Sequence, residues 1–435
     1  MSLSLTVIII VLLLLLLLLL GVRVAFALGI VGAIGLIFLL PGGESKIRMI
    51  GNLAYSAIDS FTLTPVPLFI LMGELLVMAK MNQSLYGTLS MWLGNVRGGL
   101  CHATTLSCAV FAAMSGSSLA TAATLGTIAS PEMLKRGYST RITYGTLAAG
   151  GTLGILIPPS ITMIIYGNLA GVSIGHCFIA GIIPGIICAL SFVVLVEVWG
   201  RLSPQSLPTV APSTINMRLR LKALIRLIPS VGIIFIVLGG IYLGIATPTE
   251  AGAIGAFSAL ILCIIQRDLT FKKLIGVLLS TVRTTSFIML IVASASVVSF
   301  VMQYLRVPEL LTQAVIQMEV SPYIVLSLFY LLYLVLGTLI DPVSMMVMTV
   351  PTILPTVELL GFDPIWFAVV ITITCEIGLI TPPVGLNLYI LRGISDTPLG
   401  DIALGAAPFV LVLVIDLVIF TAFPILSLWL PHLMR

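Results

Sequence analysis

Long apolar stretches follow one another along most of this chain, separated by short polar segments. Residues 5–20, 227–244 and 407–430 are each near or above the roughly 18 apolar residues that indicate a membrane-spanning helix. Residues 5–20 also resemble a signal-peptide core, but no small-residue cleavage site follows and a second apolar stretch, 24–40, comes almost at once. We therefore predict that residues 3–20 are a retained span, or part of one with its neighbour.

The composition agrees with a protein that faces lipid. Of the 435 residues, 59% are hydrophobic and 8% charged, and the mean hydropathy is +1.23, whereas soluble chains carry about 25% charged residues. The net charge of +4 comes from lysines and arginines of the polar segments, so no nucleic-acid partner is expected. The six cysteines occur singly in apolar stretches, which predicts small core residues and no metal site. The chain is predicted to be an all-α, multi-pass membrane protein in contact with the bilayer.

Two apolar stretches are interrupted in the same way. Residues 151–161 read GTLGILIPPSI, and residues 376–386 read EIGLITPPVGL. Proline lacks a backbone N–H and clashes with the preceding helical turn. Each Pro-Pro pair therefore predicts a broken helix, the first over residues 142–170 and the second over residues 364–391.

A short polar segment precedes each break by nearly the same distance. SGSS begins 43 residues before Pro158, and DPVS begins 41 residues before Pro382. Their apolar arms are too short to span alone, given the about 20 residues that a span needs. We predict two re-entrant hairpins, over about 100–135 and about 321–360. Further back, GVRVAFALGIVGAIG and ATPTEAGAIGA also match at a similar offset.

These matches divide the chain into two repeats, 1–200 and 227–435, joined by a linker, 201–226. The linker carries five basic residues and no acid, so it is predicted to be cytoplasmic. Counting spans outward from it, the basic segments 135–141 and 266–273 are cytoplasmic too, and the two hairpins enter from opposite faces. The prediction is an inverted repeat of about ten transmembrane helices and two re-entrant hairpins, with both termini outside.

Broken helices in a membrane have a physical purpose. An unpaired main-chain group in hydrocarbon costs several kcal/mol, so irregular backbone persists only where it lines a cavity or holds a ligand. The N-terminus of a half-helix offers N–H groups to an anion, and its C-terminus offers carbonyls to a cation. Two breaks opposite two hairpin tips predict a two-fold symmetric site at the midplane for small ions and a substrate.

Four stretches carry a family resemblance, and they read SGSSLATAATLGTIASPEMLKRGY, GTLGILIPPSITMIIYG, ATPTEAGAIGA and EIGLITPPVGLNLYI. Together the chain resembles, over almost its whole length, the large membrane subunit of tripartite ATP-independent periplasmic (TRAP) transporters. Arg23 departs from the proline that relatives often have there. The resemblance implies an elevator-type secondary transporter of the bacterial inner membrane, in which a sodium gradient drives uptake of an organic anion such as a dicarboxylate or sugar acid. It also implies two partners, a small four-helix membrane subunit and a periplasmic substrate-binding protein.

The resemblance further implies two sodium sites, with Na+ as the coupling ion and no other cofactor. The first would use Ser115, Ser118, Gly154, Ile157 and Pro159. The second would use Gly337, Gly378, Thr381 and Val384. Sodium, a hard cation, takes oxygen ligands, and most of these residues can supply only a main-chain carbonyl. Candidates for the substrate pocket are the neighbouring polar residues Ser117, Thr121, Ser160, Asp341 and Asn387.

Several of these residues have a structural alternative. The serines of segment 115–118 could simply allow close packing of the hairpin arms, and Thr121 could bond only within its own helix. Asp341, followed by proline, could cap a helix while also attracting a cation. Glu376 is expected at the start of the broken helix, as a partner of its dipole.

Two other functions are alternatives at this point. A single-component sodium-coupled carboxylate transporter of the same architecture would need no binding protein. An intramembrane hydrolase would need a base close to a serine, but His102 is 13 residues from Ser115 along a helical arm, about 20 Å away. We therefore predict a transporter and not an enzyme. The hairpins and broken helices are expected to move, while the other spans, including 5–20 and 407–430, form a scaffold.

Overall fold

The computed structural model describes residues 3–39, 45–208 and 217–434. Every regular element in these ranges is a helix, which confirms the all-α fold class. Within the described residues, eight helices are long and apolar enough to cross a membrane. Large apolar side chains stay exposed along many helices, among them α11 and α19 (Met217–Tyr242 and Leu399–Ala422), as suits a surface in contact with lipid.

The helices of the first half run in chain order as α1 (Leu3–Leu19), α2 (Val24–Leu39), α3 (Ser45–Ile58), α4 (Pro65–Met78), α5 (Met81–Leu93), α6 (Gly99–Ser115), α7 (Ser118–Lys135), α8 (Thr140–Leu156), α9 (Ile161–Ala170) and α10 (Ile174–Leu202). Those of the second half are α11, α12 (Pro248–Ile265), α13 (Phe271–Tyr304), α14 (Val307–Gln317), α15 (Pro322–Gly337), α16 (Pro342–Leu359), α17 (Pro364–Leu379), α18 (Leu386–Gly393), α19 and α20 (Ile425–Leu433). Thus α6–α7 and α15–α16 cover the two predicted hairpins, and α8–α9 and α17–α18 cover the two predicted broken helices.

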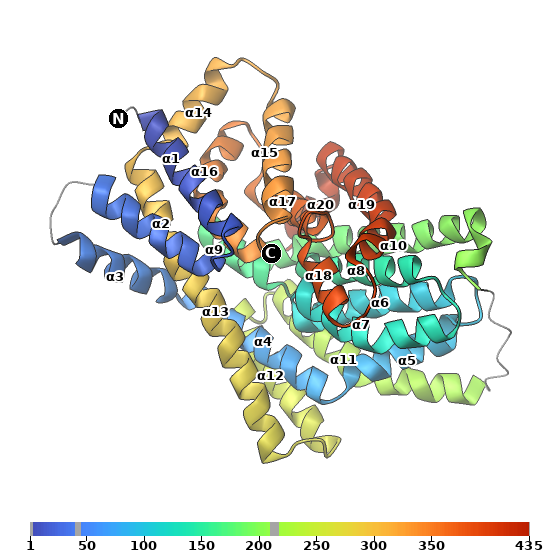
Figure 1. Ribbon diagram of the computed structural model, residues 1–435. Helices are drawn as coiled ribbons and strands as arrows, with labels where there is room; N and C mark the ends of the chain where they lie inside the picture. Colours follow the sequence, from blue (N-terminus) through green and yellow to red (C-terminus); the bar gives the residue numbers. More distant parts are fainter. Residues whose placement is uncertain (1–2, 40–44, 209–216, 435) are drawn as a thin grey trace.

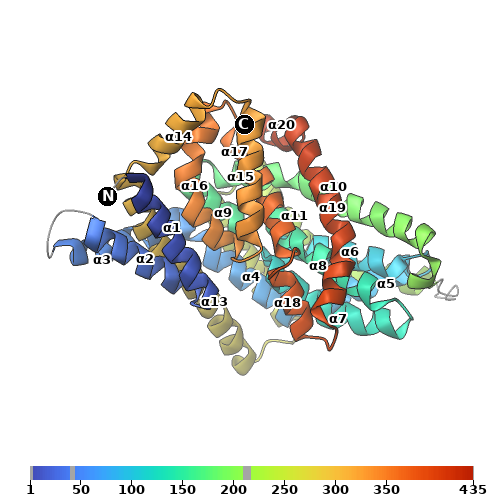
Figure 2. The same ribbon diagram turned by 45° about the horizontal axis from the view of Figure 1, so that its top comes forward.

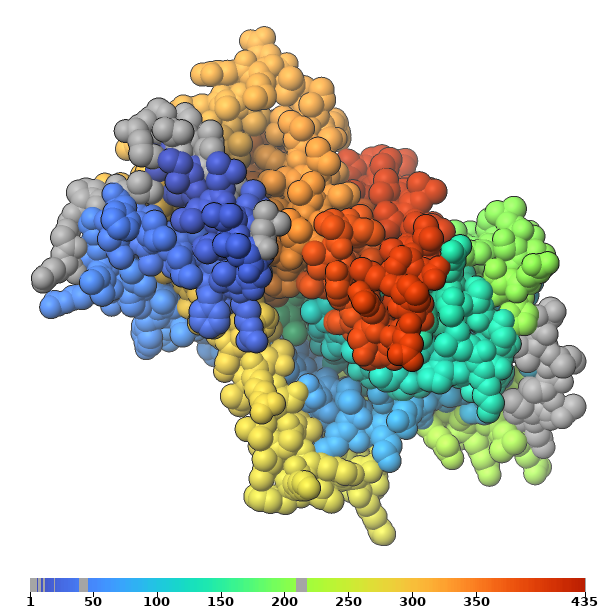
Figure 3. Space-filling model, viewed as in Figure 1, coloured from blue at the N-terminus to red at the C-terminus, as the bar shows by residue number. Residues whose placement is uncertain are grey.

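The two halves are interleaved rather than side by side. Helix α2 packs along α13, and in the counterpart contact α12 packs along α4. Helix α9 packs against α16 of the other half, while α18 packs against α7, as Figures 1 and 2 both show. In the space-filling view α18 and the start of α19 (orange-red) lie against α7 and α8 (teal) (Figure 3). Each of these contacts between the halves thus has a counterpart in which the two halves exchange roles, as a repeat predicts.

Helix α19 packs with the broken helices. Its main contacts are with α8, α10, α17 and α18. A Cβ atom added at Gly145 of α8 would collide with the carbonyl of Gly405, so the two backbones touch. At the same end of this helix pair, Arg141 and Asp401 form an ion pair at 3.0 Å. Helix α19 is thus held to α8 by direct backbone contact, and whether it belongs to the scaffold stays a prediction.

Candidate ion and substrate site at two hairpin tips and two helix breaks

The first hairpin turns in two residues. Helix α6 ends at Ser115, Gly116 adopts a left-handed φ of 61°, and Ser117 caps α7 by accepting from the Ala120 N–H. The Ser115 hydroxyl lies 2.9 Å from that of Thr121, which donates to the Ser117 carbonyl at 2.8 Å. Thr121 thus bonds back within its own helix, as the structural alternative proposed, while Ser115 Oγ accepts from the Ser117 N–H at 3.5 Å and keeps a further lone pair for a cation.

The first break lies between α8 and α9 and is buried. Residues 158–160 are buried, and Ile157 is partly buried. The Ser160 hydroxyl donates to the Ile155 carbonyl at 2.5 Å and accepts from the Met163 N–H at 3.3 Å, so it caps α9. Ser160 is fully buried and both of its bonds stabilise the break, and a role in the substrate pocket stays a prediction.

In the first half, the main chain of the hairpin tip touches the main chain of the helix break. A Cβ atom at Gly154 would lie 2.5 Å from the Ser117 carbonyl oxygen and 2.8 Å from the Ser118 nitrogen. The Ile161 N–H donates to the Gly116 carbonyl at 3.3 Å. The structure therefore brings Ser115, Ser118 and Gly154 together, with Ile157 and Pro159 in the adjoining break.

One side chain of the other half enters this first site. Asn387, in the first turn of α18, donates to Ser118 Oγ at 2.8 Å and to the Ala148 carbonyl at 3.2 Å. Asn387 is fully buried. It therefore ties the second broken helix to the first hairpin and the first broken helix.

The second hairpin has a longer tip with an acid in it. Helix α15 ends at Gly337, and Asp341 caps α16 by accepting from the Ser344 N–H at 3.0 Å, with Pro342 as the first helical residue. The Ser344 hydroxyl also donates to the Asp341 carboxylate. Asp341 is thus the helix cap that its sequence context predicted, and its carboxyl group stands at the tip.

The second break repeats the first at the level of the main chain. A Cβ atom at Gly378 would lie 2.6 Å from the Gly337 carbonyl carbon. The Gly385 N–H donates to the Thr338 carbonyl at 3.2 Å. Gly385 is the second residue after its Pro-Pro pair, as Ile161 is after the first pair. The same glycine contact and the same backbone hydrogen bond thus join tip to break in both halves.

The prolines free carbonyl groups in each break. The carbonyl four residues before a proline has no helical donor, which applies to Gly154 and Ile155 in α8 and to Gly378 and Leu379 in α17. The Ser160 hydroxyl compensates Ile155, and the Thr381 N–H donates to Gly378 at 3.2 Å. Carbonyl and hydroxyl oxygens without a full set of donors are suitable ligands for sodium. The residues implied for both sodium sites therefore fit the ion chemically, and sodium binding itself stays a prediction.

The Thr381 side chain is already engaged. Its hydroxyl donates to the Ile377 carbonyl at 2.6 Å. A donating hydroxyl keeps its lone pairs, so both the side chain and the main chain of Thr381 can supply an oxygen to an ion, and Val384 lies in the adjoining break, just before Gly385.

The position expected for Glu376 is wrong. It lies in the last turn of α17 and not at the start of a helix, because α17 runs unbroken to Leu379. There the helix dipole disfavours a negative charge. The acid is fully buried, so it needs another explanation than dipole pairing.

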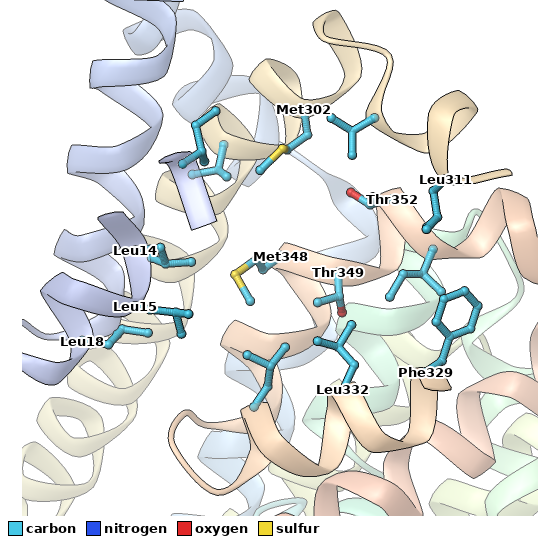
Figure 4. Close-up of a pocket in the computed structure, with 15 residues that line it drawn as sticks. Leu14, Leu15, Leu18, Met302, Leu311, Phe329, Leu332, Met348, Thr349 and Thr352 are labelled. Atoms are coloured by element: carbon cyan, nitrogen blue, oxygen red, sulfur yellow. The ribbon is translucent and has the colours of Figure 1, made fainter. Parts of the chain in front are cut away.

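Cavities lie away from the tips. An apolar cavity of about 360 Å³ separates α1 from α16, with Leu14, Leu15 and Leu18 facing Met348 and Thr349 (Figure 4). Its apolar lining suits an acyl chain and not a carboxylate.

Two more polar cavities occupy corresponding places in the two halves. One, about 330 Å³, is lined by the end of α9, by α13 and by α16 near Pro351; the other, about 570 Å³, is lined by α7 near Pro131, the start of α8 and the segment after α18. The α9–α16 pair and the α18–α7 pair are the reciprocal contacts of the fold.

The sequence model for the tripartite ATP-independent periplasmic transporter family, DctM component, matches residues 11–426. The chain belongs to this family. It is 34% identical to the C4-dicarboxylate TRAP transporter large permease protein DctM of Pseudomonas aeruginosa, over 93% of this chain and 94% of that protein. It is 32% identical to the sialic acid TRAP transporter large permease protein SiaM of Vibrio cholerae, over 95% of both chains.

Solved structures support the fold of this TRAP large permease. The YdaH transporter of Alcanivorax borkumensis superimposes with a TM-score of 0.63 at 15% identity, over 89% of this chain and 90% of that one. Family and apolar helices together make the chain a multi-pass protein of the bacterial inner membrane. As a transporter permease it is not an enzyme, which removes the hydrolase alternative.

Proposed function

We propose that this TRAP large permease imports a small organic anion carrying a carboxylate, and that sodium drives the import. The observation that carries the proposal is the matched contact of tip and break in the two halves, Gly154 on Ser117 and Gly378 on Gly337. Each contact gathers main-chain and hydroxyl oxygens beside carbonyls that have lost their helical donors. Sodium bound there would complete the coordination and hold each tip against its break.

The same geometry suits an anion beside the cations. Helices α7, α9, α16 and α18 all begin at a tip or a break, so four helix N-termini lie in this region. Free N–H groups and the helix dipole attract a carboxylate. The TRAP relatives named for C4-dicarboxylate and sialic acid support an acidic substrate. Of the candidate pocket residues, we expect Asp341 to act through its carboxyl group at the second tip, and Asn387 through its hydrogen bonds between the two halves.

We propose an elevator movement for translocation. The hairpins and broken helices pack with α10 and α19 into one body, and this body would slide against α1–α4 and α11–α13. The apolar cavity between α1 and α16 gives the sliding surface few polar contacts to break (Figure 4). The two polar cavities at reciprocal positions would serve as vestibules on opposite faces.

The family's tripartite organisation supports two partners, a small four-helix membrane subunit and a periplasmic binding protein. The alternative is a single-component transporter that needs neither. Reconstitution separates the two. Proteoliposomes with this chain alone, with the small subunit, and with the small subunit plus the binding protein are tested for uptake of labelled C4-dicarboxylates and sialic acid.

The expected result is uptake only in the complete system and only with an inward sodium gradient. Uptake by the chain alone would favour the single-component alternative. Uptake that is equally fast with potassium or choline replacing sodium would overturn the proposed coupling.

A further inference from the structure

Helix α4 and the loop before it, residues 59–64, contact the proposed moving body at several points. Followed along the chain, the loop meets α9, the start of α4 meets α10, and its later turns meet the end of α6. The proposed elevator movement slides α6, α9 and α10 past α4, so it has to break these contacts. This surface, which we call the α4 seat, therefore fixes where the body stands in the present structure.

The contact between the loop and α9 is polar. The Ser60 and Thr62 hydroxyls lie 2.6 Å apart, and both are within hydrogen-bond distance of the side-chain carbonyl oxygen of Asn168, to which Ser60 donates at 3.1 Å. Asn168 lies in the last turn of α9, the second half of the first broken helix. One amide oxygen of the body thus holds two hydroxyl groups of the loop.

The contacts of α4 itself are an aromatic pair and a backbone approach. The buried rings of Phe69 in α4 and Phe178 in α10 pack edge to face, with centroids 5.9 Å apart. A Cβ atom at Gly73 would lie 2.9 Å from the Met114 carbonyl oxygen and 3.2 Å from the Cα atom of Ser115. Ser115 is the last residue of α6 before the first tip. Helix α4 therefore covers the first tip, which has no room to move toward α4 in this position.

The polar and the apolar contacts differ in how strictly they fix a position. Apolar burial is non-directional, so the ring pair tolerates small displacements. A hydrogen bond weakens steeply as its angle departs from linear, so the contact at Asn168 sets the position more sharply. Asn168 also lines the polar cavity of about 330 Å³ beside α13, and water that enters this cavity can replace the bonds when they break. The contact is therefore suited to open and re-form.

We propose that Asn168 is a positioning residue, which latches the moving body onto the α4 seat and so keeps the first tip against Gly73. Asn168 supplies the acceptor and the loop supplies the donors, so aspartate at position 168 preserves the latch and leucine removes it. The inference rests on the proposed elevator movement, since a latch matters only for a body that moves. It does not depend on sodium or on the identity of the anion.

Cross-linking tests whether the body leaves the seat during transport. In the double variant Ser60→Cys/Asn168→Cys, a bis-methanethiosulfonate reagent with a two-carbon bridge joins the loop to α9, while the six native cysteines are buried. Uptake by the complete reconstituted system is expected to fall by about tenfold or more after cross-linking, and to return after reduction. The matched control is Glu74→Cys/Ser280→Cys, which joins α4 to α13 where their side chains form a hydrogen bond of 2.7 Å. Its uptake should be the same before and after the reagent.

Electron paramagnetic resonance distances test the latch without transport. One spin label replaces Lys135 at the end of α7 in the body, and the other replaces Gln266 just after α12; both positions are exposed. Asn168→Leu is expected to lower the share of molecules at the distance of the present structure, relative to the remaining molecules, by about threefold or more. Asn168→Asp, which keeps the acceptor, should restore the wild-type share.

Several results would overturn the proposal. Failure of the reagent to join the two cysteines, judged by mass spectrometry, would show that the loop and α9 are not neighbours. Unchanged uptake after cross-linking would show that the body does not leave the seat. Identical distance distributions for the wild-type protein and Asn168→Leu would show that Asn168 does not hold the body.

The same experiments separate the latch from the proposed function. If the cross-link stops uptake but uptake proves independent of sodium, the latch stands and the sodium coupling fails. If no sample takes up any of the anions, the proposed function fails, and the distance distributions alone decide for or against the latch.

Discussion

The two helix breaks make the same backbone contacts but have different surroundings. In both, a glycine presses on the opposite tip and an N–H beyond the Pro-Pro pair bonds to a tip carbonyl. The first break is buried and capped by Ser160, whereas Pro382 and Pro383 of the second are exposed and the start of α18 has no side-chain cap. The first tip carries only hydroxyls, and the second carries Asp341.

This difference indicates that the two proposed sites differ in how far they are formed before an ion binds. The first site is held from three sides, by its tip, its break and Asn387 of the other half, so its geometry is largely formed before any ion binds. The second site is open on the side of its prolines, and under the proposed sodium coupling we expect it to depend more on Asp341 and on a bound ion to close the tip. The repeated backbone makes two sites possible, and the side chains make them unequal.

The largest effect is expected from the glycines at the two contacts. Gly154→Ala would place a Cβ atom 2.5 Å from the Ser117 carbonyl oxygen in the buried first site, where no backbone can move aside. We expect sodium-dependent uptake to fall by about 30-fold or more, equivalent to about 2 kcal/mol. Gly378→Ala, at 2.6 Å from Gly337, should cost less, about tenfold, because the second break is exposed at its two prolines.

Uptake by reconstituted protein, with sodium titrated, measures both variants. The control is Gly276→Ala in α13, where an added Cβ meets nothing within 4 Å. Equal losses of uptake for the two variants would contradict the proposed difference between a rigid first site and an adaptable second site.

A smaller effect is expected from the charge at the second tip. Asp341→Asn keeps a good helix cap but removes the negative charge, so thermal stability should change little. The apparent sodium affinity should fall about three- to tenfold, up to about 1.4 kcal/mol. Thermal stabilisation of the purified protein by sodium chloride against potassium chloride measures this. The matched control is Asp363→Asn, which caps α17 in the same way away from the tips, and a similar loss there would mean that Asp341 is only a cap.

The smallest effect is expected from Thr381→Val. The Thr381 hydroxyl is turned back onto its own helix by its bond to the Ile377 carbonyl, so we expect an ion at the second site to use the main-chain carbonyl at this position, which valine retains. We expect the sodium affinity to change less than about threefold, below about 1 kcal/mol. A loss of tenfold or more in the same sodium titration would show that the side chain is a ligand after all.

Much of the secondary structure could be predicted from the sequence, because a membrane strictly limits which backbone structures can cross it. Apolar length predicts spans, Pro-Pro pairs predict breaks, and Asp341 before Pro342 predicts a cap, which the structure confirms. These are local effects of chain chemistry. The order of the four motifs along the chain also indicated the TRAP family, which the comparisons confirm.

Contacts between segments that are distant in the chain could not be predicted from the sequence. Nothing local indicates that Asn387 reaches Ser118, or that α19 joins the broken helices through Gly405. The sequence by itself determined where helices form and where they break, because bilayer thickness and proline act within one segment. Only the tertiary structure decided which carbonyls, hydroxyls and acids meet, because those meetings depend on how the two halves interleave.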